Sequence, residues 1–179
     1  NAQVHSTLDE ALAGCVFAAG LTARKRHMGH TCVDVREAAQ RLIQIAATQE
    51  VALLFGNEAY GLSNDELSKC QLMISIPTDE AYTSLNVASA VQIMAYELRM
   101  AWLAAPAPAQ APIELARLDD IELFYKRLEE TLIRIQFLDP NNPKRLMPRV
   151  RRLFARTVLE KEELNILMGM LKSINLNVK

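Results

Sequence analysis

The chain has 179 residues, of which half are apolar and 23% are charged, and its formal net charge is -1. This composition excludes a disordered chain, and the length suffices for one hydrophobic core with a small appendage. The overall charge does not indicate a nucleic-acid partner, so any such site has to come from local clustering of basic residues. No apolar run is long enough to span a membrane, and the three cysteines lack disulfide or zinc spacing, so we expect a cytoplasmic location.

Hydrophobic patterns predict alternating strands and helices in the first part of the chain. An apolar run ended by Gly56 is typical of a central strand that is buried on both faces. Thr7-x-x-Glu10 and Ser63-x-x-Glu66 are capping boxes, which mark helix starts. In chain order we expect a short helix to residue 14, a strand at 15–19, a polar loop at 20–32, a helix at 35–48, a strand at 51–55, a short helix at 63–70, a strand at 72–76 and a helix at 84–104. This alternation indicates an α/β fold with a parallel sheet.

A change in composition divides the chain. Residues 105–112 are rich in proline and alanine, and such stretches act as semi-rigid spacers. Beyond them, apolar residues recur at helical spacing with a break at 139–143, and Thr157-x-x-Glu160 predicts the start of the last helix. We therefore expect an α/β domain over 1–104, a linker over 105–112 and an all-helical C-terminal domain over 113–179.

Two segments that follow predicted strands have residues suited to binding a ligand. The first begins at Gly56, where a missing side chain lets a ligand approach the backbone, and continues to the acid Glu58. In the second, the strand at 72–76 ends in a polar loop that leads to Thr83 and Ser84 at a helix N-terminus, where free N–H groups suit a carboxylate or phosphate. Ordinary explanations stay open for both, since glycine turns are common and Ser and Thr are favoured helix caps.

Together the two segments resemble a known family. The residues FGNEAYGL (55–62) are similar to the second motif of the SpoU (TrmH-like) class of SPOUT methyltransferases, and IPTDEAYTSLNVASAVQIMAYEL (76–98) is similar to the third. The stretches STLDEALAGC, TARKR and ELNIL extend the similarity over nearly the whole chain. They point to the TrmJ subfamily, whose members methylate a ribose in the anticodon loop of tRNA.

The resemblance implies a fold, a cofactor and partners. It implies that 1–104 is the knot-forming part of a SPOUT methyltransferase domain, whose trefoil knot is an exception to the rule that chains are unknotted. It also implies S-adenosyl-L-methionine as cofactor, tRNA as substrate, and a homodimer in which each subunit completes the other's active site. Glu58, Ser84 and Asn86 match positions tied to activity. The positions that match the cofactor pocket are Leu21, Thr22, Ala23, Leu54, Gly56, Ile76, Thr83, Ser84 and Leu85.

One part of the family pattern has no counterpart here. The family begins with a strand and an Asn-Gly-rich turn that carries an arginine assigned to the ribose hydroxyl, and this chain starts past that point. A non-catalytic homologue that binds cofactor or RNA therefore stays open as an alternative to an RNA 2′-O-methyltransferase. A nucleotide-binding Rossmann-type domain is a further alternative, although the chain has no G-x-G-x-x-G.

Basic residues cluster in two places. Arg24 and Arg26 belong to the polar loop, and the stretch 144–156 has six basic residues and no acid. An exposed helix face could explain the second cluster, but such clustering is also typical of a phosphate-binding surface. We expect RNA contacts from Arg24, Arg26, Arg145, Arg149 and Arg152.

A metal site is the last possibility that the spacing raises. His27, His30 and Cys32 would give three ligands within one short segment and no fourth, which is poor zinc geometry. We therefore predict an ordinary polar loop and no metal.

Overall fold

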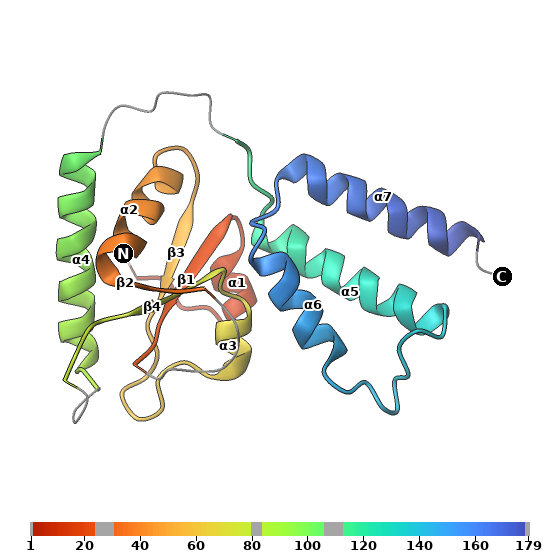
Figure 1. Cartoon of the computed structure of the whole chain (residues 1–179), viewed down its shortest axis with the longest axis horizontal. Coiled ribbons are helices and arrows are strands. Elements are labelled where there is room, and N and C mark those ends of the chain that lie inside the picture. The colour runs from red at the N-terminus through yellow and green to blue at the C-terminus, as the bar shows by residue number, and fades with distance from the viewer. Residues whose placement is uncertain (1, 24–30, 80–83, 106–112, 178–179) are drawn as a thin grey trace. The chain divides into compact units, whose positions relative to one another are not determined.

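The computed structural model describes residues 2–23, 31–79, 84–105 and 113–177 (Figure 1). The chain divides into two compact units. The sheet unit comprises Phe17–Pro112, and the helical unit comprises Asn1–Val16 together with Ile113–Lys179. None of the helices within the described ranges is long and apolar enough to cross a membrane.

Four parallel strands form the sheet unit's core, in the spatial order β2-β4-β1-β3. β1 is central, and its Ala19 lies opposite Leu53 on one side and Leu72 on the other. Ala18 and Ala19 have no exposed surface, as expected for a parallel strand covered on both faces. The strands are β1 (Phe17–Leu21), β2 (Cys32–Asp34), β3 (Val51–Leu54) and β4 (Leu72–Ser75).

Three helices accompany these strands: α2 (Val35–Ala46), α3 (Asn64–Ser68) and α4 (Val87–Ala104). α2 and α4 pack side by side (Figure 1). Buried Ala38, Ala39 and Leu42 line the inner face of α2, and Met94 is fully buried on α4. Both ends of the capping box at Ser63 are formed, so α3 begins where the sequence predicts.

The helical unit contains α1 (Leu8–Leu12), α5 (Leu118–Arg134), α6 (Leu146–Ala155) and α7 (Lys161–Asn177). Its core includes Phe124, whose ring meets that of Phe154 edge-on at 5.2 Å between centroids. Thr131 is buried and fully satisfied, since its hydroxyl donates to Arg127 O and accepts from Asn175 Nδ2, each at 2.8 Å. This contact joins α5 to α7.

Residues 2–16 pack with the helical unit, although the sequence assigned them to the α/β domain. The Cys15 carbonyl accepts a hydrogen bond from Leu118 N at 2.8 Å, and Gly14 N donates to Asp119 Oδ1 at 3.3 Å. Most of the expected linker, at 106–112, lies outside the described residues. The domain limits 1–104, 105–112 and 113–179 therefore stay a prediction.

Several expected bounds differ from the structure, and the strand predicted at 51–55 as central and buried on both faces is β3, at the edge of the sheet and mostly half-buried. The strand predicted at 15–19 runs instead over Phe17–Leu21, and β2 was not foreseen because its three residues are defined by pairing with β4. The long helix begins at Val87 rather than at residue 84, since Asn86 is its cap. The predicted cap Thr157 instead donates its hydroxyl to Phe154 O at the end of α6.

Candidate active site

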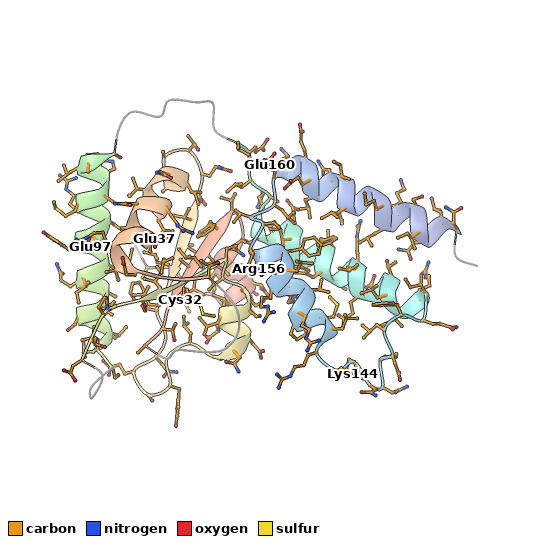
Figure 2. The ribbon with its side chains drawn as sticks, viewed as in Figure 1. Cys32, Glu37, Glu97, Lys144, Arg156 and Glu160 are labelled. Carbon is orange, nitrogen blue, oxygen red and sulfur yellow. The ribbon has the colours of Figure 1, made fainter. Side chains whose placement is uncertain are left out.

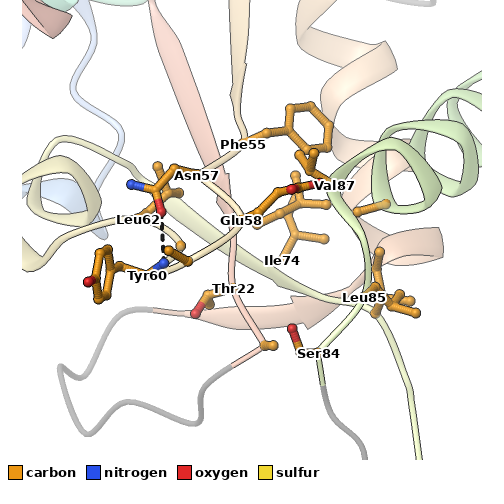
Figure 3. Close-up of a pocket in the computed structure, with 17 residues that line it drawn as sticks. Thr22, Phe55, Asn57, Glu58, Tyr60, Leu62, Ile74, Ser84, Leu85 and Val87 are labelled. Atoms are coloured by element: carbon orange, nitrogen blue, oxygen red, sulfur yellow. Dashed lines mark hydrogen bonds between the residues drawn. The ribbon is translucent and has the colours of Figure 1, made fainter.

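A cavity of about 230 Å³ lies at the carboxyl ends of β1, β3 and β4 (Figure 3). Ligands of open parallel sheets bind at this edge of the sheet. Thr22 N donates to Ile74 O at 2.9 Å, so the turn after β1 is held against β4. The cavity is lined by Leu21, Thr22, Ala23, Phe55, Gly56, Asn57, Glu58, Ala59, Tyr60, Gly61, Leu62, Ile74, Ile76, Ser84, Leu85, Val87 and Ala90.

The loop after β3 is a tight turn that requires both of its glycines. Asn57 O accepts a hydrogen bond from Gly61 N at 2.9 Å, and Asn57 Oδ1 accepts from Tyr60 N at 2.7 Å. Gly61 has φ +67°, in the left-handed region that favours glycine. A Cβ on Gly56 would lie 2.1 Å from the Gly61 carbonyl carbon, which leaves no room for a side chain. The second predicted motif therefore forms one compact loop.

Glu58 and Asn86 join the second motif to the third. Asn86 Nδ2 donates to Glu58 Oε1 at 3.0 Å. The other end of the same side chain caps α4, because Asn86 Oδ1 accepts from Ala88 N at 2.8 Å and from Ser89 N at 3.4 Å. The cap fixes which end of the amide faces inward, so the Glu58 carboxylate is offered a donor and not an acceptor.

The chemistry of the cavity favours a neutral or cationic ligand. Among the described lining residues, Glu58 is the single charged side chain, and no lysine, arginine or histidine is present. Leu21, Ile74 and Ile76 add an apolar wall. Within the described lining, the Glu58 carboxylate would attract a positively charged group, and the apolar wall would contact an apolar ring system.

Most of the predicted site residues come together at this cavity. Leu54 does not line it, since its side chain is buried in the core, and Asn86 contacts it through Glu58. Thr83 lies outside the described residues. Those that do line the cavity are Leu21, Thr22, Ala23, Gly56, Glu58, Ile76, Ser84 and Leu85.

Sequence reasoning missed several lining residues, including Asn57 and Tyr60. Both lie inside the motif FGNEAYGL. The spacing of Asn57 and Gly61 is typical of a turn, and this signal could have indicated that the whole loop folds against the cavity.

The basic residues of the stretch 144–156 differ in their surroundings. Arg151 forms an ion pair within the helical unit, since its two terminal nitrogens donate to the two Glu122 carboxylate oxygens at 2.5 and 2.7 Å. Lys144, Arg145 and Arg149 are exposed, and their side chains have no acid partner among the described residues. Lys144 and Arg156 bracket α6, as marked in Figure 2.

Arg152 lies on α6 and is partly buried. Arg24 and Arg26 lie outside the described residues, as do His27 and His30. Within the described part, no group of three His, Cys, Asp or Glu side chains is placed to hold a metal ion.

Two families match this chain. The SpoU rRNA Methylase family matches residues 2–96, and the family described as tRNA methyltransferase TrmJ, C-terminal domain, matches residues 119–179. Together they account for both units of the structure and leave the proline-rich segment between them.

Individual proteins and structures are also similar. The tRNA (cytidine/uridine-2′-O-)-methyltransferase TrmJ of Klebsiella pneumoniae is 48% identical over 179 residues, covering 97% of this chain and 73% of that protein. The tRNA (cytidine/uridine/adenosine-2′-O-)-methyltransferase TrmJ of Pseudomonas aeruginosa is 45% identical, covering 95% and 70%. The crystal structure of TrmJ from Z. mobilis superposes with a TM-score of 0.81 at 27% identity, covering 97% of this chain and 73% of that one. The structure of a probable methylase family protein from Haemophilus influenzae superposes with a TM-score of 0.56 at 36% identity, covering 99% of this chain and 74% of that one.

Proposed function

The chain belongs to the SpoU methylase family and, within it, to the TrmJ-type tRNA 2′-O-methyltransferases, and from this membership we propose how its residues carry out ribose methylation of tRNA. The methyl donor is S-adenosyl-L-methionine, whose sulfonium supplies an electrophilic methyl group. The chain's own task is to hold the donor, align the ribose 2′-hydroxyl and receive its proton.

The donor fits the cavity at the strand ends. Its adenine suits the apolar wall of Leu21, Ile74 and Ile76, and its sulfonium suits the Glu58 carboxylate, the one charged side chain of the described lining. Gly56 keeps the loop backbone close to the cavity, where N–H and C=O groups can bind the adenine edge. The residues proposed to hold the donor are Leu21, Thr22, Ala23, Leu54, Gly56, Ile76, Thr83, Ser84 and Leu85, with Leu54 acting from the core through the position of its strand.

Glu58 is proposed to act on the ribose. Its carboxylate can accept a hydrogen bond from the 2′-hydroxyl and take the proton as the new carbon–oxygen bond forms. Asn86 positions Glu58 through the 3.0 Å hydrogen bond and is itself held by α4. Ser84 stands at the cavity with its hydroxyl directed inward (Figure 3) and is proposed to bind the ribose.

Partners follow from charge and exposed apolar surface. Arg24, Arg26, Arg145, Arg149 and Arg152 are proposed to bind tRNA phosphates, supported by the exposure of Arg145 and Arg149. The anticodon loop is proposed as the target region, and the cytoplasm, where tRNA is found, as the location. No membrane partner is proposed.

α4 is proposed to form the interface of a homodimer. It exposes Tyr96, Trp102 and Leu103, each by more than half of its surface, and an apolar patch of this kind is typical of a protein contact. The loops after β3 and β4 are proposed to form the family's trefoil knot, since β4 lies between β1 and β2 in the sheet.

The observation that carries the proposal is the Glu58–Asn86 contact, which joins two motifs of the family at one cavity. The test is methyl transfer from labelled S-adenosyl-L-methionine to tRNA by the purified protein, with the modified nucleoside identified by mass spectrometry. We expect a 2′-O-methylated nucleoside, and a loss of about 10²- to 10⁴-fold in kcat for Glu58→Gln, the range typical of general acid–base groups.

Glu50→Gln is the matched control, because Glu50 is an exposed acid directly before β3, at the end of the strand opposite the cavity. It should retain wild-type kcat. A protein that binds the donor but places no methyl group on any tRNA ribose would refute the proposal.

A further inference from the structure

Tyr60 stands apart from the other residues of the cavity, because its side chain is 75% exposed. In Figure 3 the ring lies at the outer edge of the cavity and points away from Glu58. Within the described part of the chain, the ring has no aromatic contact and the phenol has no hydrogen-bond partner. The ring therefore contributes little to the fold around it.

The backbone beneath this ring is nevertheless held firmly. Tyr60 N donates to Asn57 Oδ1 at 2.7 Å, and the next residue, Gly61, donates to Asn57 O at 2.9 Å. Gly56 packs directly against Gly61, where no Cβ would fit. An exposed aromatic ring on a fixed backbone can be contacted by a ligand with little loss of conformational entropy, since only its two side-chain torsions remain to be ordered.

An RNA substrate offers unpaired bases that can stack on such a ring. RNA-binding proteins recognise single-stranded loops by stacking unpaired bases on aromatic side chains, and this stacking tolerates any base because each has a π face. In the proposed function, the target ribose is held near Glu58, inside the cavity. A ring directed outward from the same loop faces the nucleotide that precedes or follows the target in the strand.

We propose that Tyr60 stacks against the base adjacent to the methylated nucleotide and so positions the target ribose. This inference rests on the proposed function, and it assigns to Tyr60 a role in substrate binding rather than in methyl transfer. The contact uses the ring and not the hydroxyl, because the phenol faces solvent.

Two substitutions separate the ring from the hydroxyl. Tyr60→Phe keeps the ring, and we expect wild-type KM for tRNA. Tyr60→Leu removes it, and we expect KM to rise about 5- to 150-fold, the range that corresponds to one stacked base. The melting temperature should stay at the wild-type value in both variants, because the ring is 75% exposed and makes no aromatic contact or hydrogen bond within the described part of the chain.

Anticodon stem-loop RNAs with an abasic site on either side of the target nucleotide identify the stacked base. Wild-type protein should bind one of the two abasic RNAs as weakly as Tyr60→Leu binds the intact RNA, and Tyr60→Leu should lose nothing further on that RNA. Equal KM for wild type and Tyr60→Leu, or losses that simply multiply on both abasic RNAs, would overturn the assignment. Both outcomes presuppose an active wild-type protein, whereas a wild type without methyl transfer overturns the proposed function instead.

Discussion

Replacing Arg151 with alanine should destabilise the helical unit without removing an RNA contact. The guanidinium makes a two-pronged contact with the Glu122 carboxylate, at 2.5 and 2.7 Å, and its central carbon lies 4.4 Å from the centroid of the Tyr125 ring. The side chains of the ion pair are 26% and 30% exposed, so water screens the pair only in part. The arginine is thus a packing residue of α6, although it lies in a stretch that looks like a phosphate-binding surface.

The expected loss follows from these contacts. Breaking a fully buried ion pair costs about 3–5 kcal/mol, and partial exposure lowers this toward about 2 kcal/mol. Loss of the contact with the ring adds about 0.5–1 kcal/mol. We therefore expect Arg151→Ala to lower the free energy of unfolding by about 2–3 kcal/mol, which for a chain of this size lowers the melting temperature by about 4–12 °C.

Thermal unfolding followed by circular dichroism measures this difference. Arg149→Ala is the matched control, because it removes the same charge from the same helix at an exposed position without an acid partner, and should change stability by less than about 0.5 kcal/mol. Arg149→Ala should instead reduce the salt dependence of tRNA binding by about one phosphate contact, while Arg151→Ala leaves it unchanged. Equal melting temperatures for the two variants would refute the structural role of Arg151.

Further predictions concern the site loop, the cysteines and one strained residue. Gly56→Ala should abolish S-adenosyl-L-methionine binding in calorimetry, because the added Cβ would collide with the backbone of Gly61; unchanged affinity would show that the turn is not needed. Burial raises the pKa of the Cys70 thiol to about 12, so in the folded protein a thiol reagent at pH 8 should label exposed Cys32 and spare Cys70, and labelling of both would contradict the packing. Since the folded state holds the Cys70 proton more tightly than the unfolded chain, its contribution to stability is complete below pH 9.0 and declines as pH rises toward about 12, which unfolding measured across that range can test. Val158 has φ 49°, which a β-branched residue adopts only with strain, so Val158→Gly should raise the melting temperature, and a lower melting temperature would contradict the strain argument.

The sequence predicted the elements whose signals are local. The capping box at Ser63 needs only side chains within one turn, and it begins α3 as expected. The apolar run over 51–55 predicts a strand from composition alone, and β3 forms there, but it lies at the edge of the sheet with Val51, Ala52 and Leu53 half-buried, so the prediction of a central strand buried on both faces is wrong. The motif-based site residues mostly line one cavity for a similar reason, because each motif is a short loop directly after a strand.

The errors arise where distant residues decide the structure. β2 exists because Cys32–Asp34 pair with β4, and no pattern within three residues can predict such a partner. Thr157 has the spacing of a capping box, but its hydroxyl donates backward to Phe154 O, and Glu160 N donates to Glu163 Oε2 at 2.9 Å. The same spacing therefore gives a cap at Ser63 and none at Thr157, where the chain before α7 pairs with a distant segment: Leu159 O accepts from Ala116 N and Lys161 N donates to Glu114 O, each at 2.9 Å.

The discontinuous make-up of the helical unit affects how the protein can be cut and how it is synthesised. α1 packs on α5, yet the whole sheet lies between them in the sequence, so a growing chain completes α1 long before its partner has been translated. A recombinant fragment starting at Ile113 would lack α1 and expose to water the part of α5 that α1 contacts. RNA-binding experiments on the isolated C-terminal helices would therefore use a fragment with more exposed apolar surface than the same helices have in the intact chain.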